Sequence, residues 1–180
     1  MPNVAFLRTR VEFIDAFFSK GEVSEIWLTF SDPQMKSENC RLTSPLFLER
    51  YRRMLREGGI IHLKTDSMFL HQYSKAIAEQ NGLKILACTE DLYGTDRESL
   101  YQSEMASVCG KDAIDALFGV RTFYENMFLS QGYKITYLSF VIDKEGAFTY
   151  PEFDDKYWRE VEGPRRSFGH QRGASPASKQ

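Results

Sequence analysis

The stretch Ile26–Pro33, with the sequence IWLTFSDP, decides the fold class and supplies the first candidate site residue of this chain. Its apolar first part, Ile26–Phe30, predicts a buried strand. Pro33 cannot continue a strand ladder, so the chain turns there and leaves Asp32 at the rim of a sheet. In an open α/β sheet, ligands bind at the rim beyond the carboxyl ends of the strands. Asp32 is therefore a candidate site residue, although Ser-Asp-Pro is also ordinary turn chemistry.

A second predicted strand ends in the same way. Ile60–Lys64 is apolar apart from its histidine and lysine, and Thr65-Asp66-Ser67 follows it. If the two strands are parallel neighbours, Asp32 and Asp66 lie near each other at one rim. Paired carboxylates at a rim favour a functional site. The alternative is that each strand simply ends in a polar turn.

A third acidic candidate lies on a helix that the apolar spacing predicts over residues 112–129. Thr122 and Glu125 are three residues apart and therefore share a face of this helix. Two interpretations remain open for the pair. It belongs to a site, or it is a solvated polar stripe opposite Phe118 and Met127.

Strands and helices alternate along most of the chain. Strands are predicted at Asn3–Leu7, Ile26–Phe30, Ile60–Lys64, Leu83–Ala87 and Tyr133–Ile142. Helices are predicted at Val11–Phe18, from Ser44 to Gly59, at Met68–Gln80 and at Asp112–Leu129. The alternation predicts an α/β fold of parallel βαβ units, in which the last strand can lie antiparallel at a sheet edge. The polar residues 89–110 predict an irregular insertion with room for one helical turn, and no pattern continues beyond Tyr150.

Composition and charge exclude several classes of protein. Apolar residues make up 42% of the chain, and the formal net charge is −2, which is typical of a globular protein without a global positive field. Three cysteines lack CxxC spacing and three histidines form no ligand pattern with them. The sequence therefore predicts no disulfide framework, no metal site, no membrane span and a reducing cytoplasm. We expect a domain over residues 1–150 and a polar extension over residues 151–180, with a basic tail from Pro164 to Gln180.

A set of short motifs gives the chain a family resemblance. The motifs follow one another as Phe30-Ser31-Asp32-Pro33, Lys36, Arg41-Leu42-Thr43, Lys64-Thr65-Asp66 and Thr122-Phe123-Tyr124-Glu125. Each is weak alone, but in this order the chain from about residue 3 to 140 resembles the bacterial tRNA (guanine-N7)-methyltransferases. That family uses S-adenosylmethionine to methylate the variable-loop guanine of tRNA, position 46. An unrelated doubly wound hydrolase or kinase is less consistent, because no nucleophile or phosphate-loop motif occurs.

The resemblance implies a role for each matching residue. Asp32 would line both the cofactor and the catalytic site. Lys36, Asp66, Thr122 and Glu125 would bind the substrate guanine, and Arg41 would contact RNA. The implied partner is tRNA, with no membrane or metal.

The chain also departs from the family pattern. The loop after Asp32 is shorter and less basic than in the family, and no Gly-x-Gly-x-Gly turn follows an early strand. The resemblance therefore implies a Rossmann-like class I methyltransferase fold that is incomplete, covering its C-terminal two-thirds, with weak S-adenosylmethionine binding. The alternative is a non-catalytic RNA- or protein-binding remnant. An unpaired strand edge and exposed Trp27, Phe17 and Phe18 are expected, and they favour a homodimer.

Overall fold

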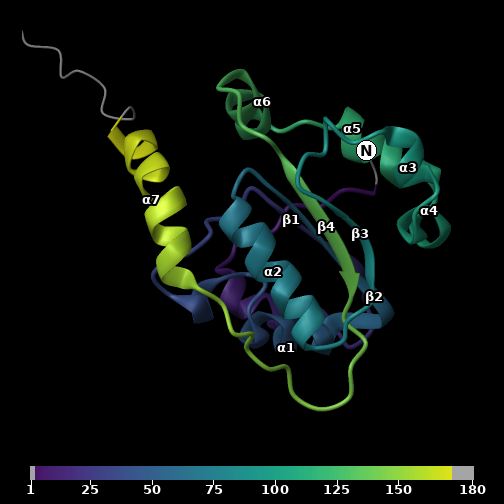
Figure 1. Cartoon of the computed structure of the whole chain (residues 1–180). Coiled ribbons are helices and arrows are strands. Elements are labelled where there is room, and N and C mark those ends of the chain that lie inside the picture. The colour runs from purple at the N-terminus through teal and green to yellow at the C-terminus, as the bar shows by residue number, and fades with distance from the viewer. Residues whose placement is uncertain (1–2, 172–180) are drawn as a thin grey trace, which may run out of the picture.

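A mixed four-stranded sheet forms the centre of the computed structural model, which describes residues 3–171 and the side chains of residues 3–163. The strands are β1 (Val23–Thr29), β2 (Leu55–Thr65), β3 (Ile85–Thr89) and β4 (Thr136–Val141). Their order across the sheet is β1-β2-β4-β3 (Figure 1). β1 and β2 are parallel, and β4 is antiparallel to both β2 and β3. The α/β class and the antiparallel last strand are confirmed, but β4 is an inner strand and not the edge.

Nine helical segments surround this sheet in residues 3–171. The 3₁₀ helices are η1 (Val11–Ala16) and η2 (Glu38–Cys40). The α-helices are α1 (Pro45–Met54), α2 (Met68–Gln80), α3 (Arg97–Tyr101), α4 (Glu104–Cys109), α5 (Lys111–Gly119), α6 (Phe123–Ser130) and α7 (Asp155–Gln171). α2 has the bounds that the sequence predicts, because Ser67 caps its first turn by accepting a hydrogen bond from Leu70 N at 3.1 Å.

The two faces of the sheet carry two apolar cores. On one face, α1 and α2 pack against β2 and β4, and the buried core includes Tyr51, Ile77 and Leu138. On the other face, α4 and α5 pack against the sheet through a second core that includes Met105 and Ile114. None of the helices in the described part of the chain has both the length and the apolar character needed to span a bilayer.

The N-terminal segment differs from the prediction. Residues 3–7 form no strand, and Phe6 is 98% exposed, because no described strand lies beside this segment to pair with it. The expected helix at Val11–Phe18 is a short 3₁₀ helix. β1 is consequently an edge strand, with β2 as its partner in the described part of the chain. Trp27, Phe17 and Phe18 are among the exposed large apolar side chains, as the sequence predicts.

Two predicted helices are shorter than expected. The helix expected from Ser44 to Gly59 ends at Met54, because Leu55 already pairs with Val23 and Gly58 accommodates the irregular start of β2 at a φ of +71°. The helix expected over residues 112–129 breaks into α5 and α6, with Val120 in an extended conformation between them. The insertion over residues 89–110 contains two short helices, α3 and α4.

The C-terminal region is also more ordered than predicted. The sequence shows no regular pattern after Tyr150, yet the structure has a helix there, α7, which begins at Asp155. Phe153, just before α7, packs edge-on against Phe69 and Tyr73 of α2. The proposed boundary at residue 150 stays a prediction. The side chains of the expected basic tail, from Pro164, lie outside the described ones.

Candidate active site

The parallel strands β1 and β2 end at the same edge of the sheet, which lies beside α6 in Figure 1. Thr29 pairs with Lys64, and Phe30 N donates a hydrogen bond to Lys64 O at 2.9 Å. Asp32 and Asp66 thus follow the carboxyl ends of two adjacent parallel strands. This is the edge at which open α/β sheets bind ligands.

The turn after β1 is backbone-strained on both sides of Asp32. Phe30 and Gln34 are the non-glycine residues with positive φ in the described chain, at +53° and +48°. Such conformations are costly for side-chain-bearing residues and gather at functional sites. Asp32 stabilises the turn, because its Oδ1 accepts a hydrogen bond from Gln34 N at 2.9 Å. Asp32 is exposed, so its second carboxylate oxygen faces outward for other contacts.

A buried ion pair lies beside this turn. Lys64 Nζ is 2.7 Å from Glu125 Oε1, and the side chains are 5% and 0% exposed. Lys64 Nζ also donates to Leu117 O at 2.8 Å, which ties the end of β2 to α5. Burial lowers the pKa of Lys64, and the neighbouring Glu125 opposes that shift. A buried pair of this kind is stable only while both partners remain, since either charge alone would be uncompensated.

Thr122 and Glu125 form a capping box at the start of α6. The Thr122 hydroxyl accepts from Glu125 N at 3.1 Å, and Glu125 Oε2 lies 3.4 Å from Thr122 N. The Tyr93 hydroxyl donates to Glu125 Oε1. A carboxylate offers about four acceptor positions. Lys64, Tyr93 and the Thr122 amide occupy three of them, so Glu125 keeps one position for a ligand.

These residues line a cavity at the edge of the sheet. Its volume is about 220 Å³. The wall consists of Trp27, Thr29, Lys64, Ala116, Leu117, Val120, Thr122 and Glu125. The cavity is thus mainly apolar, with a carboxylate, an ammonium and a hydroxyl at defined positions. This is the composition of a site that orients a planar or apolar ligand by a few polar contacts.

The structure places Asp66 under the C-terminal helix. Asp66 is 8% exposed, and the next residue, Ser67, donates from its hydroxyl to Glu162 Oε1 of α7 at 2.5 Å. Glu162 Oε2 also accepts from Phe69 N at 2.8 Å. The Glu162 carboxylate thus occupies the amino end of α2, where the helix dipole favours negative charge.

Arg41 is held inside the protein. Its side chain is 0% exposed, its Nη2 lies 2.6 Å from Asp155 Oδ2, and its guanidinium stacks over Phe69 and Tyr73 at 4.6 and 4.3 Å. In this conformation Arg41 joins α2 to α7, and an RNA phosphate cannot reach it unless α7 moves. Its role as an RNA contact stays a prediction. Lys36, in contrast, is exposed.

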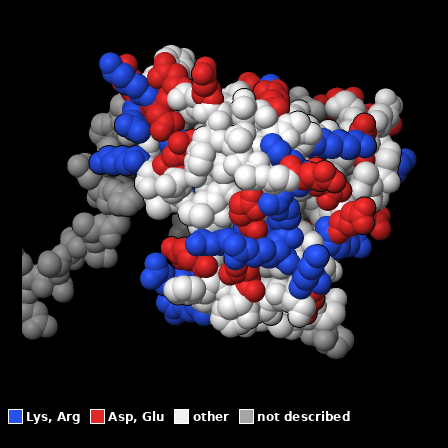
Figure 2. Space-filling view, turned by 90° about the horizontal axis from the view of Figure 1, so that it is seen from below, with Lys and Arg blue, Asp and Glu red and all other residues white. Residues whose placement is uncertain are grey.

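The surface on the opposite side carries mixed charge. Figure 2 views the molecule from the side where β1 and β2 begin, and basic and acidic side chains alternate across it. Several arginines of the described chain pair with acidic groups, as Arg53 does with Asp15 at 3.0 Å. Such a face lacks the single-sign field that attracts nucleic acid.

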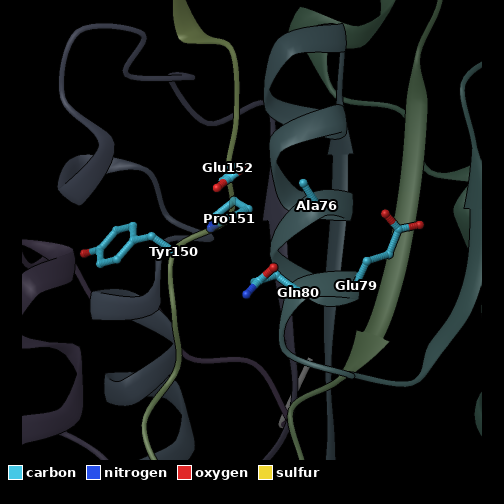
Figure 3. Close-up of a pocket in the computed structure, with 6 residues that line it drawn as sticks. All are labelled: Ala76, Glu79, Gln80, Tyr150, Pro151 and Glu152. Atoms are coloured by element: carbon cyan, nitrogen blue, oxygen red, sulfur yellow. The ribbon is translucent and has the colours of Figure 1, made fainter.

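A larger hollow between α2 and the C-terminal segment does not carry the candidate chemistry. Figure 3 shows its lining, which consists of Ala76, Glu79 and Gln80 on α2 and of Tyr150, Pro151 and Glu152 on the C-terminal segment. The hollow is open to solvent, and its ionisable groups Glu79 and Glu152 are exposed. Neither carboxylate lies at the carboxyl edge of the parallel strands. We therefore place the candidate site at the smaller cavity.

The sequence missed two members of this site. Lys64 and Tyr93 hold Glu125, yet neither was assigned a role from the sequence. A lysine inside an apolar strand is a usable signal, because a buried ammonium requires a partner. Tyr93 carries no such signal, since it lies in the polar insertion and reaches Glu125 only through the tertiary fold.

The fold and the cavity at the carboxyl ends of β1 and β2 define the class: a mixed α/β protein with a candidate ligand site beyond two parallel strands. Comparison with known proteins makes this class specific. A family model described as "Putative methyltransferase" matches residues 1–135. The chain belongs to this putative methyltransferase family, and its sheet is the part of a Rossmann-like methyltransferase fold that the resemblance implies.

Several relatives carry a more specific name. The chain is 48% identical over 154 residues to a tRNA (guanine-N(7)-)-methyltransferase of Bacteroides fragilis, covering 86% of this chain and 55% of the relative. It is 46% identical to the protein of that name from Bacteroides thetaiotaomicron, again over 154 residues, which are 86% of this chain and 55% of the relative. Identity is 49% over 140 residues to the one from Porphyromonas gingivalis, covering 78% and 51%. The chain spans about half the length of the curated relatives it matches.

Proposed function

We propose that this chain acts in the N7-methylation of guanine in tRNA, and that it supplies the edge that holds the target base. The proposal extends to the variable-loop guanine and to S-adenosylmethionine as the methyl donor. Its main support is the identity of 46–49% to relatives named for that reaction. The cavity at the end of β2, with the Lys64–Glu125 pair in its wall, is the structural feature consistent with it.

The chemistry of guanine N7 suits this group of residues. N7 carries a lone pair at neutral pH, so its alkylation needs positioning of the base more than a strong general base. Positive charge spreads into the purine as the new bond forms, and fixed carboxylates beside the ring stabilise it. The N1–H and the exocyclic amine of guanine are hydrogen-bond donors. We propose that Glu125, in the cavity wall, accepts from one of them, and that Asp66, which is buried and not part of that wall, becomes the second acceptor when the base binds. Asp32 would face the same ring from β1.

The RNA must deliver its base to a recessed site. A base enters such a cavity only after leaving its stack. We propose that Lys36, which is exposed, binds a phosphate near the turn after β1. We assign the tRNA contact to this edge, because the opposite face is electrostatically mixed (Figure 2).

The residues present do not form a complete S-adenosylmethionine site. Pockets that enclose a ligand of that size measure roughly 300–1,000 Å³, and the cavity here is about 220 Å³. None of the 12 glycines stands in a Gly-x-Gly-x-Gly turn that would let the backbone approach a cofactor. We therefore assign no step to the cofactor on this chain, and we propose that S-adenosylmethionine binds the isolated chain weakly.

The cellular setting follows from the substrate. We propose a cytoplasmic location, because the proposed substrate is tRNA. The three cysteines are free thiols in the structure, which suits a reducing compartment. The open edge of β1 makes a homodimer the proposed state of the isolated chain.

A methyl-transfer assay tests this function. The chain would be incubated with a tRNA transcript and methyl-labelled S-adenosylmethionine, alone and together with the remaining segment of the Bacteroides fragilis relative. We expect N7-methylguanine in the mixture and little or none with the chain alone. Asp32→Asn should lower the rate of the mixture about 100-fold, as the loss of a charge-stabilising group does. Glu145→Gln, at an exposed carboxylate away from the edge, is the matched control.

Two results would contradict the proposal. Methylation at an atom other than guanine N7 would assign a different substrate chemistry to the edge. Absence of methyl transfer from two segments that fold and associate would support the non-catalytic alternative.

A further inference from the structure

Three potential metal ligands of different types converge on one face of the sheet, outside the candidate active site. Glu25 comes from β1, His62 from β2 and Cys109 from the last position of α4. One ligand atom from each lies within 4.8 Å of the other two. The sequence predicts no metal site, because its cysteines lack CxxC spacing and its histidines form no ligand pattern with them.

The imidazole of His62 is buried, fixed in orientation and incompletely paired. The side chain is 0% exposed, and its Nδ1 lies 2.7 Å from the Tyr137 hydroxyl. The ring stacks on Trp27 with centroids 4.0 Å apart and an interplanar angle of 5°. Nε2 has no hydrogen-bond partner, although Glu25 Oε2 lies 3.3 Å from it. A buried ring nitrogen that faces a carboxylate and a thiol is in a position to coordinate an ion together with them.

Its two companions are held less tightly. Trp27 Nε1 donates to Glu25 Oε2 at 3.1 Å, which fixes the carboxylate beside the histidine while leaving acceptor positions open. Cys109 is a free, partly buried thiol at the end of α4. Gly110 ends that helix at a φ of +82°, a conformation that suits glycine, and thereby sets where the thiol lies.

We propose that Glu25, His62 and Cys109 bind one zinc ion, with a water molecule in the fourth position. Zinc is the ion whose tetrahedral sites combine carboxylate oxygen, imidazole nitrogen and thiolate sulfur. Bond lengths of about 2.0–2.3 Å place tetrahedral ligand atoms roughly 3.3–3.7 Å apart. His62 Nε2 and Glu25 Oε2 are already 3.3 Å apart, so the site closes mainly through a movement of the partly buried Cys109, whose sulfur lies within 4.8 Å of the other two ligand atoms.

The surroundings match those of a metal-bound histidine. Such a residue usually engages its second ring nitrogen in a hydrogen bond that fixes its orientation, and the Tyr137 hydroxyl fills this role. On binding, the Cys109 thiol would lose its proton to solvent and coordinate as thiolate.

The ion would connect elements that are otherwise joined loosely. α4 belongs to the polar insertion between β3 and α5, whereas Glu25 lies on the edge strand. A zinc ion would therefore tie this insertion to β1 next to the candidate cavity, whose wall includes Trp27. The inference is independent of the proposed tRNA chemistry.

Metal titration of the tag-free chain tests the site. The protein would be treated with a chelator, titrated with zinc chloride by calorimetry, and titrated with cobalt(II) in an absorption spectrometer. We expect one equivalent of zinc, competition between the two metals, and a thiolate-to-cobalt charge-transfer band with the strong visible bands of a tetrahedral site. Zinc should also raise the melting temperature of the full chain.

Matched variants locate the ligands. Cys109→Ser should abolish the charge-transfer band and weaken zinc binding about 100-fold or more, since even outer partners of a metal site contribute 10–100-fold. Cys88→Ser removes the thiol that lies 3.6 Å from His71 Nε2, and Cys40→Ser removes an exposed thiol; both should bind as the parent chain does. Tyr137→Phe keeps all three ligands and should weaken binding about tenfold.

The outcomes that overturn the proposal are distinct. A parent chain that takes up no zinc lacks the site. Binding that persists in Cys109→Ser but disappears in Cys88→Ser assigns the metal elsewhere. His62→Gln alters a buried residue, so circular dichroism would show whether this variant folds, with His71→Gln as the control for loss of a buried histidine. Zinc binding by a folded His62→Gln variant would also contradict the proposal.

Discussion

Strands β4 and β1 lie in one sheet but in very different surroundings. Five of the six residues of β4 are buried, whereas Leu28 is the one buried residue among the seven of β1. β4 has a strand on each side and helices on both faces. β1 has one strand partner in the described chain, and its Trp27 is 39% exposed. The burial of these strand residues depends on the position of the strand in the sheet more than on its apolar content. The candidate site lies at β1, the less enclosed of the two strands.

The comparison separates a stabilising region from a functional one. The cores around β2 and β4 provide the apolar contacts on which the fold depends. The edge at β1 carries a strained turn, a cavity and exposed aromatic side chains. Functional edges of this kind are commonly drawn from the less stable parts of a protein.

The largest effect should come from the inner strand. Phe140→Ala removes a 0% exposed side chain from β4 and should lower the free energy of unfolding by about 3–5 kcal/mol. Phe17→Ala truncates the same side chain where it is 51% exposed and should cost less than about 1 kcal/mol. Urea unfolding followed by circular dichroism measures both. Similar losses would show that the N-terminal segment is as firmly packed as β4.

The buried ion pair at the cavity should rank next. Lys64→Met leaves the Glu125 carboxylate uncompensated at 0% exposure and should cost about 3 kcal/mol. Adding Glu125→Gln should recover a large part of that loss, because the buried charge is then removed. The control is Lys84→Met, whose pair with Glu104 is more than half exposed and should matter by less than about 1 kcal/mol. No recovery in the double variant would mean that the charges do not govern this site.

The third effect depends on pH through His71 of α2. Burial lowers the pKa of this side chain to about 4, with Glu90 opposing and Lys75 assisting, and Cys88 is its other neighbour. The unfolded chain takes up the proton near pH 6.5, so stability is retained above that pH and declines as the pH falls toward 4. We expect the chain to lose about 2 kcal/mol from this group between pH 7.5 and pH 5.

The variant His71→Phe isolates that contribution. Its stability should change less between the two pH values than that of the parent chain, by about the same 2 kcal/mol. Urea unfolding at both pH values gives the comparison. An unchanged pH dependence would show that His71 titrates normally in the folded protein.

The smallest effect concerns association through the open edge. We expect the isolated chain to self-associate in sedimentation experiments at increasing concentration, since β1 and its exposed aromatic neighbours are uncovered. Phe17→Lys together with Phe18→Lys should weaken this association about tenfold, or ~1.4 kcal/mol. A parent chain that is monomeric at all concentrations would show that the edge is protected in solution.

The sequence was sufficient wherever local chemistry decides the structure. The capped helix α2 and the two strand ends at Asp32 and Asp66 follow from apolar runs, prolines and capping residues. Failures occurred where tertiary pairing overrides local preference. Leu55 joins a strand although the helical pattern continues through it, and Thr122 starts a new helix although apolar spacing predicts one continuous element.

The site shows the same division between local and tertiary information. A sequence pattern could identify Thr122 and Glu125 as partners, because their capping box is local. It could not show that Lys64 and Tyr93 reach the same carboxylate, or that α7 buries Arg41. No spacing rule could predict that Glu25, His62 and Cys109 lie together, because each comes from a different secondary-structure element.

Calorimetric titration of the isolated chain with S-adenosylmethionine tests the central claim most directly. The claim is that this chain provides the base-holding edge of a methyl-transfer site, while the open side at β1 lacks the residues that enclose a cofactor. We expect a dissociation constant weaker than about 100 µM, because the cavity is small and no glycine-rich turn is present. Binding at about 1 µM would contradict the account, since it would show that Asp32 and its neighbours form a complete cofactor site by themselves.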